Sequence, residues 1–178
     1  MSRIGRLPIT IPAGVTVDFK NNVITLKGPL GELKQEIKDI DVKIENNTIT
    51  LSRKNDTKEL KAKHGLYRSL INNMVTGVTK GYEKSLIVNG VGYKAAVEND
   101  KLTLFVGFSH TVDFKIPKSV KVECPSITEI LVKGINKTEV GQVAANIRAI
   151  KKVEPYHLYG IRYKDEIIQK KEGKTAGK

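Results

Sequence analysis

The chain of 178 residues contains one cysteine, three histidines and no tryptophan. A single cysteine cannot form an internal disulfide, so nothing in the sequence indicates an oxidising compartment. His64, His110 and His157 lie far apart, and none has a cysteine or carboxylate pair at the spacing of metal ligands. The sequence therefore predicts no metal site, no catalytic residue and no cofactor.

Long apolar runs are also missing, so no segment is suited to cross a bilayer. The N-terminal MSRIGRLPITIP contains Arg3 and Arg6 but lacks the apolar stretch of a secretory signal. Pro8 and Pro12 would interrupt an amphipathic targeting helix. We therefore expect a cytoplasmic protein without a membrane partner.

Acidic residues are too few to balance the basic ones, with 19 Asp and Glu against 31 Lys and Arg and a formal charge of +12. Solubility alone requires a smaller imbalance. The excess points to a polyanionic partner. An apolar content of 39% is sufficient for a packed core.

The chain resembles itself at an offset of 78 residues. NNVITL at 21–26 matches NDKLTL at 99–104, and VKIE at 42–45 matches VKVE at 120–123. Because order and spacing are both kept, the match predicts one structural unit used twice.

Each half shows alternating, β-branched strand patterns followed by a helical stripe. Helices are expected over about 58–76, with Leu66 on the apolar face and Gly77 and Gly81 as stops, and over 138–152. Second-half strands are expected over 83–98, 101–108, 111–116 and 120–133. The predicted class is α+β with two duplicated domains, residues 1–81 and 82–178, each an antiparallel sheet with one helix across a face.

The segment VNGVGYKAA at 88–96 matches a loose dinucleotide-binding pattern through Gly90, Gly92 and Ala95. Such a site needs a helix to begin there, so that its amides face the pyrophosphate. The residues that follow predict another strand, so we expect a bulge or turn at Gly90–Gly92. An enzyme that uses the Gly90–Ala95 turn remains an alternative.

Three of the six tyrosines lie in VEPYHLYGIRYK at 153–164, beside a lysine-rich C-terminus. Rings stack on unpaired bases and cations neutralise phosphates, so the segment suits RNA, although the rings could instead close the core. We expect Tyr156 to pack the domain, and Tyr159 and Tyr163 to face RNA. Residues after Tyr159 are expected to form a tail outside the packed fold.

Four motifs together resemble the family of bacterial large-subunit ribosomal protein L-six: MSRIGRLPITIPAGVTV, NGVGYKA, LFVGFSHTV, and EPYHLYGIRYKDE followed by KKEGK. The resemblance covers essentially the whole chain. It implies a structural constituent of the large ribosomal subunit rather than an enzyme. It also implies binding to large-subunit rRNA near the sarcin–ricin loop and the stalk base, beside other ribosomal proteins and without a small-molecule substrate.

The chain departs from the C-terminal signature of that family, because His157 and Tyr159 stand where lysines are expected. Arg162, Lys164 and the lysine-rich C-terminus are therefore better candidates for the phosphate contacts than these two positions. Separately, an RNA-binding module that acts outside the ribosome remains an alternative. The residues expected to contact rRNA are Arg3, Arg6, Lys94, Ser109, His110, Lys152, His157, Tyr159, Gly160, Arg162, Tyr163, Lys164, Lys170, Lys171, Lys174 and Lys178.

Overall fold

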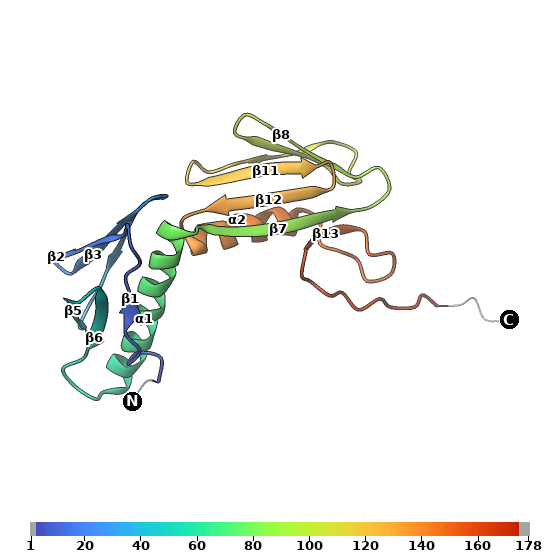
Figure 1. The fold of residues 1–178 in the computed structure, drawn as a ribbon. Coiled ribbons are helices and arrows are strands. Elements are labelled where there is room, and N and C mark those ends of the chain that lie inside the picture. The colour runs from blue at the N-terminus through green and yellow to red at the C-terminus, as the bar shows by residue number, and fades with distance from the viewer. Residues whose placement is uncertain (1–2, 175–178) are drawn as a thin grey trace. The chain divides into compact units, whose positions relative to one another are not determined.

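The computed structural model describes residues 3–174 and contains two helices and several small antiparallel sheets (Figure 1). The chain divides into two compact units. One comprises Met1–Tyr82 with Ile135–Lys137, and the other comprises Glu83–Gly134 with Thr138–Lys178. The predicted α+β class is confirmed.

The first half forms two three-stranded sheets, in the orders β2-β3-β4 and β1-β6-β5. Ile24 and Leu26 from β3, Ile49 from β6, and Ile71 and Val78 from the helix are buried together in its core. The elements are β1 (Ile9–Thr10), β2 (Thr16–Lys20), β3 (Val23–Gly28), β4 (Gly31–Glu36), β5 (Asp41–Glu45), β6 (Thr48–Ser52) and α1 (Lys58–Thr79).

The helix α1 begins where Thr57 accepts a hydrogen bond from the Leu60 amide. It runs past Gly77, which is a buried helical residue and not the expected stop. The helix ends at Thr79, and Gly81 follows the C-cap residue Lys80 with a φ of 74°, which suits a glycine, and donates its amide to the Thr76 carbonyl. Leu66 was expected in the apolar stripe but is 55% exposed.

The second half has a sheet of order β8-β9-β10 and a four-stranded sheet of order β11-β12-β7-β13. Its elements are β7 (Tyr82–Asn89), β8 (Lys94–Glu98), β9 (Lys101–Phe105), β10 (Val112–Lys115), β11 (Val120–Ser126), β12 (Glu129–Gly134), α2 (Lys137–Ile150) and β13 (Gly160–Tyr163). The helix α2 buries Val140, Val143, Ala144 and Ile147.

The predicted duplication is confirmed element by element. A shift of 78 residues moves β2 at 16–20 onto 94–98, which is β8. It also moves Thr25, in the central strand β3, onto Thr103 in the central strand β9. The order β1-β6-β5 recurs as β7-β12-β11. Only β13 has no counterpart among the first-half strands that the structure describes.

Three boundaries differ from those expected. The segment 83–98 is two strands, because the chain turns at Gly90–Gly92 as the glycines predicted. The segment 120–133 is a hairpin of β11 and β12, and α2 ends at Ile150 rather than at residue 152.

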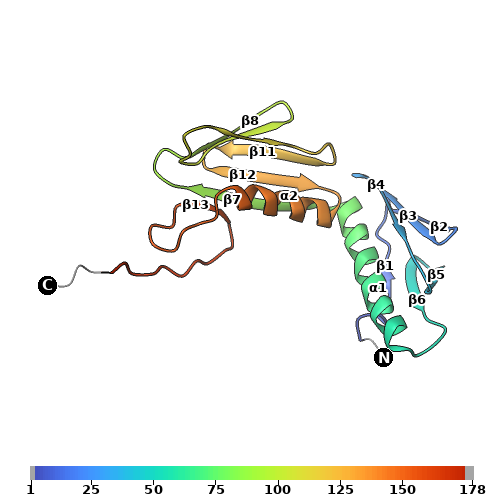
Figure 2. The ribbon, with the colours of Figure 1, turned by 180° about the vertical axis from the view of Figure 1, so that it is seen from behind.

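The expectation of a tail outside the fold after Tyr159 is wrong. Residues 160–163 form β13, which pairs antiparallel with β7 and lies beside it in both views (Figure 1 and Figure 2). Ile161 is 0% exposed, so this strand belongs to the core of the second unit. Long-range strand pairing of this kind leaves no local sequence pattern.

Candidate nucleic-acid interface

A tight turn connects α2 to β13 and presents two rings. The Leu158 amide donates to the Glu154 carbonyl and the Glu154 amide to the Tyr159 carbonyl, each at 3.1 Å. Asn89 at the end of β7 holds the turn through a bond of 2.9 Å from its Nδ2 to the Leu158 carbonyl. His157 and Tyr159 are thereby stacked, with ring centroids 5.6 Å apart.

Gly160 closes this turn from inside the fold. It is buried with a φ of 141°, and a Cβ atom there would lie 2.7 Å from backbone atoms of Lys152 and Val153. Its role is to let the chain pass between the turn and the end of α2, rather than to touch a ligand.

A second group of rings comes from the loops beside β8 and β9. Tyr93 follows the glycine turn, and its ring centroid lies 6.4 Å from that of Tyr159. A Cβ atom at Gly107 would meet the Tyr93 hydroxyl at 2.7 Å, so the loop after β9 passes against Tyr93. In this loop, Phe108 and His110 stack with centroids 6.1 Å apart. We call the five rings the aromatic surface: Tyr93, Phe108, His110, His157 and Tyr159.

Cations border the aromatic surface. The Lys151 ammonium lies 4.9 Å from the centre of the Phe108 ring. Lys94 and Lys152 are exposed, as is Ser109 in the same loop as Phe108. Within residues 3–174 neither Lys94 nor Lys152 has a carboxylate within ion-pair distance. Exposed rings beside unpaired cations are typical of surfaces that bind RNA.

A cluster around Glu166 fixes the segment after β13. Its carboxylate accepts from both sides of the Arg148 guanidinium, and one of these contacts is 2.9 Å. The Tyr163 amide also donates to Glu166, at 3.1 Å. These bonds, Arg148 first, lower the pKa of the Glu166 carboxyl. The Tyr163 ring lies against Arg148 and Lys84, at 5.5 and 5.8 Å.

Some of the residues near the C-terminus that were expected to contact rRNA instead bind other residues of the fold. Arg162 donates to the Glu166 carbonyl, and Lys164 pairs with Glu129 at 3.2 Å, so both are used within the fold. Tyr163 is half-buried, whereas Tyr156 is 47% exposed and not packed inside as expected.

The remaining predicted residues lie on exposed segments. Lys170, Lys171 and Lys174 are exposed in an extended stretch, which is attached by a bond from the Lys171 amide to the Pro155 carbonyl. Arg3 and Arg6 are exposed on the first unit. Lys178 lies outside the described residues.

Three members of this region were not predicted: Tyr93, Phe108 and Lys151. Tyr93 and Phe108 lie in the loops beside β8 and β9, and Lys151 directly follows α2. NGVGYKA and LFVGFSHTV, which carry Tyr93 and Phe108, were used for the resemblance, and the first also for the dinucleotide-binding pattern. Both motifs place an aromatic residue directly after a glycine, and this recurrence was the available signal.

Other candidate sites give no support for an enzyme. β8, and not a helix, follows the Gly90–Ala95 turn, so no helical amides face a phosphate there. No group of His, Cys, Asp and Glu within residues 3–174 has the arrangement of a metal site. No helix in the same part of the chain is long and apolar enough to cross a membrane.

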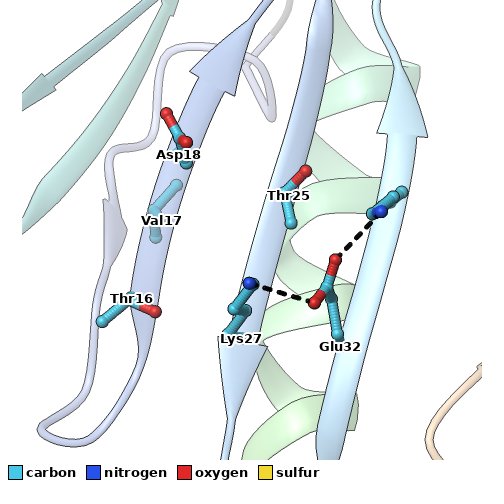
Figure 3. Close-up of a pocket in the computed structure, with 7 residues that line it drawn as sticks. Thr16, Val17, Asp18, Thr25, Lys27 and Glu32 are labelled. Atoms are coloured by element: carbon cyan, nitrogen blue, oxygen red, sulfur yellow. Dashed lines mark ion pairs between the residues drawn. The ribbon is translucent and has the colours of Figure 1, made fainter.

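A hollow on the β2-β3-β4 sheet of the first unit is lined by charged side chains that form ion pairs with one another (Figure 3). The Glu32 carboxylate lies 3.3 Å from the Lys27 ammonium and 3.1 Å from that of Lys34. Lys34 and then Lys27 lower the pKa of Glu32. These paired groups leave little net charge with which to bind an ion.

The duplicated α+β fold carries a surface of rings and cations, which is typical of nucleic-acid-binding proteins. The sequence profile described as ribosomal protein L6 matches residues 11–81 and 89–164. A "large ribosomal subunit protein uL6" from Shouchella clausii is 52% identical over 177 residues, covering 99% of each chain. Its counterpart from Listeria monocytogenes serotype 4a is 53% identical with the same coverage, and that from Prosthecochloris aestuarii is 48% identical over 100% of this chain and 99% of its own.

The chain therefore belongs to the ribosomal protein L6 family, as the four sequence motifs predicted. It is a structural ribosomal protein and not an enzyme.

Proposed function

We propose that the chain is a structural constituent of the large ribosomal subunit and that the aromatic surface of its second unit binds large-subunit rRNA. The observation that carries the proposal is the convergence of Tyr93, Phe108 and Tyr159 from three separate segments beside unpaired lysines. The names of the relatives place those proteins in the large subunit.

The chemistry of the surface supports scaffolding. Exposed rings stack on unpaired bases irrespective of their identity, and lysines neutralise the phosphates that flank those bases. The turn that presents His157 and Tyr159 is held by hydrogen bonds at both ends, so its geometry is fixed before RNA arrives. A rigid surface of this kind holds RNA segments at a set distance without altering them chemically.

The location is also part of the proposal. By family resemblance the RNA lies near the sarcin–ricin loop and the stalk base, and other ribosomal proteins there are the protein partners. The two halves of the duplication act as domains 1–81 and 82–178, and the protein works within cytoplasmic ribosomes.

Ring and charge variants test the RNA contact separately. Phe108→Ala and Tyr159→Ala should each weaken binding to deproteinised large-subunit rRNA by about 1–3 kcal/mol, with little change in salt dependence. Lys94→Gln and Lys152→Gln should instead each reduce the slope of log affinity against log salt by about 0.7–0.9. Lys121→Gln is the matched charge control, because Lys121 is paired with Glu123.

The proposal fails if the Phe108→Ala/Tyr159→Ala double variant binds rRNA as tightly as the wild type. A tagged wild-type chain that does not sediment with large subunits at high salt would support the module outside the ribosome instead.

A further inference from the structure

We propose that the first unit carries a second RNA-backbone site, formed by Arg3, Arg6, Lys58 and Lys61. These four cations lie on the N-terminal segment and on the first turns of α1, and we call them the arm surface. The inference rests on the proposed function, since it names a second contact with the same class of partner.

The N-terminal segment is packed along α1. A Cβ atom at Gly5 would lie 2.5 Å from Nδ1 of His64, so the backbone passes directly over the His64 ring. Arg68, one turn further along α1, donates from Nε to the Leu7 carbonyl at 3.3 Å. Both views show the start of the described chain beside the first turns of α1 (Figure 1 and Figure 2).

The ring beneath the segment is rigidly held. His64 is 4% exposed, with Nε2 at 3.0 Å from the Leu51 carbonyl and Nδ1 at 3.1 Å from the Arg53 guanidinium. Arginine cannot accept a hydrogen bond, so Nδ1 accepts, Nε2 donates and the ring is neutral. The Arg53 side chain is 8% exposed and pairs with Asp56 at 2.6 Å. The N-terminal segment therefore packs against a side chain whose position is fixed.

Helical spacing brings the lysines to the same side. Lys58, Lys61 and Arg68 lie within about 80° of one another around α1, and Lys61 is one turn before His64. The N-terminal segment, which packs on His64 and is bound by Arg68, therefore begins near Lys61. Glu59 projects about 100° away from Lys58, so it faces a different direction.

The arm surface carries positive charge that no carboxylate in the described part of the chain neutralises, unlike the lysines of the neighbouring sheet. On the β2-β3-β4 sheet and the loop after it, lysines are matched with carboxylates: Lys20 with Asp18, Lys27 and Lys34 with Glu32, and Lys38 with Glu36. Within residues 3–174, no carboxylate lies within ion-pair distance of the four cations of the arm surface.

A row of cations suits a nucleic-acid strand better than a single anion. The helix rises about 4.5 Å from Lys58 to Lys61, and the N-terminal segment with Arg3 and Arg6 continues the row towards Arg68, which holds Leu7. A strand of duplex places one phosphate every 3.4 Å or so along its axis, so several phosphates can face the row. A bound single phosphate would instead need donors that converge on one point, whereas these four cations are distributed over the N-terminal segment and the first turns of α1.

The test compares two triple variants that remove the same charge. Arg3→Gln/Arg6→Gln/Lys61→Gln should lower the salt slope for deproteinised large-subunit rRNA by about 2–3, so that a fourfold change in salt alters affinity roughly 16- to 64-fold less. Lys20→Gln/Lys34→Gln/Lys38→Gln, the control, should change the slope by less than about 1, because those lysines are already paired.

Gly5→Ala tests the placement of the arm without changing charge. Its Cβ atom must displace the His64 ring or the segment, so the salt slope should fall while the folded fraction, followed by thermal unfolding, persists. An unchanged slope in folded Gly5→Ala protein would contradict the positioning by His64.

The outcomes separate this inference from the proposed function. A wild-type chain with no salt-dependent affinity for rRNA overturns both. If the wild type binds but the arm and control triples have equal slopes, only the arm surface is wrong. If the arm triple binds rRNA normally yet fails to enter large subunits, the partner of the arm is a protein and the inference is overturned.

Discussion

Two glycines within helices should respond in opposite directions to the same substitution. Gly77 in α1 and Gly141 in α2 are both interior helical residues. Alanine is favoured over glycine at such positions by about 1 kcal/mol. A Cβ atom at Gly141 meets nothing within 4 Å, so Gly141→Ala should raise the melting temperature of its unit by about 4–8 °C.

At Gly77 the surrounding atoms make the same substitution destabilising. A Cβ atom there would lie 2.0 Å from the Ile135 carbonyl oxygen, a backbone atom that cannot rotate away. Relieving this overlap requires a backbone shift, and overpacking of this kind costs about 1–3 kcal/mol or more. Because the overlap is with a backbone atom, the cost lies at the upper end of this range. After the helix-propensity gain, Gly77→Ala should therefore destabilise the first unit by about 2 kcal/mol, a fall of roughly 8–16 °C.

Calorimetry resolves the melting of each unit, and urea titrations followed by circular dichroism provide the free energies. The reasoning is refuted if Gly77→Ala raises the melting temperature as Gly141→Ala does, since the Ile135 carbonyl would then not lie over the helix.

Four further predictions concern the second unit. Gly160→Ala should destabilise it by about 2–4 kcal/mol in urea titrations, because strain at positive φ adds to a backbone overlap, and loss under 1 kcal/mol would contradict this. Glu123, whose pKa two lysines lower from 4.5 to about 2, should stabilise the fold above about pH 4.5 and lose that effect as pH falls towards 2. Melting curves of Glu123→Gln and wild type should accordingly converge over that window, and parallel curves would refute the ion pairs. Truncation after Tyr159 should unfold the unit because it removes β13, whereas truncation after Gln169 should leave its melting temperature within a few degrees. Calorimetric titration with nicotinamide and flavin dinucleotides should show no binding at Gly90–Gly92, and a stoichiometric complex would contradict that.

The sequence was informative where a pattern repeats or is local. The duplication was visible because strands and turns recur at one spacing, and the fold keeps that spacing through β3 and β9. The turn at Gly90–Gly92 followed from glycines placed between two strand patterns.

Local patterns gave wrong predictions where the environment of a residue depends on its angular position around a helix or on a neighbouring segment. Leu66 was placed in the apolar stripe because it is apolar, although it lies about 140° from Ile71 around the helix. Gly77 resembled a helix stop, but it is required by a close approach that only the fold reveals.

The candidate site was predictable only in part, because strand pairing assembles it. The turn at 154–159 was recognised from its rings, whereas its neighbours Tyr93 and Phe108 come from loops beside β8 and β9, which precede α2. Tyr156 and Tyr163 were assigned opposite environments from those observed, since the pairing of β13 with β7 decides which ring is covered. No pattern within 153–164 contains that information.

The position of β13 in the chain gives the second unit a definite order of completion during synthesis. Its sheet needs residues 160–163, which follow every other strand that the structure describes in this unit. A nascent chain interrupted earlier leaves the edge of β7 open, with unpaired backbone groups that can pair with another chain. The turn with His157 and Tyr159 is attached to that same strand. Only a polypeptide translated past Tyr163 can therefore assemble the surface that we assign to RNA.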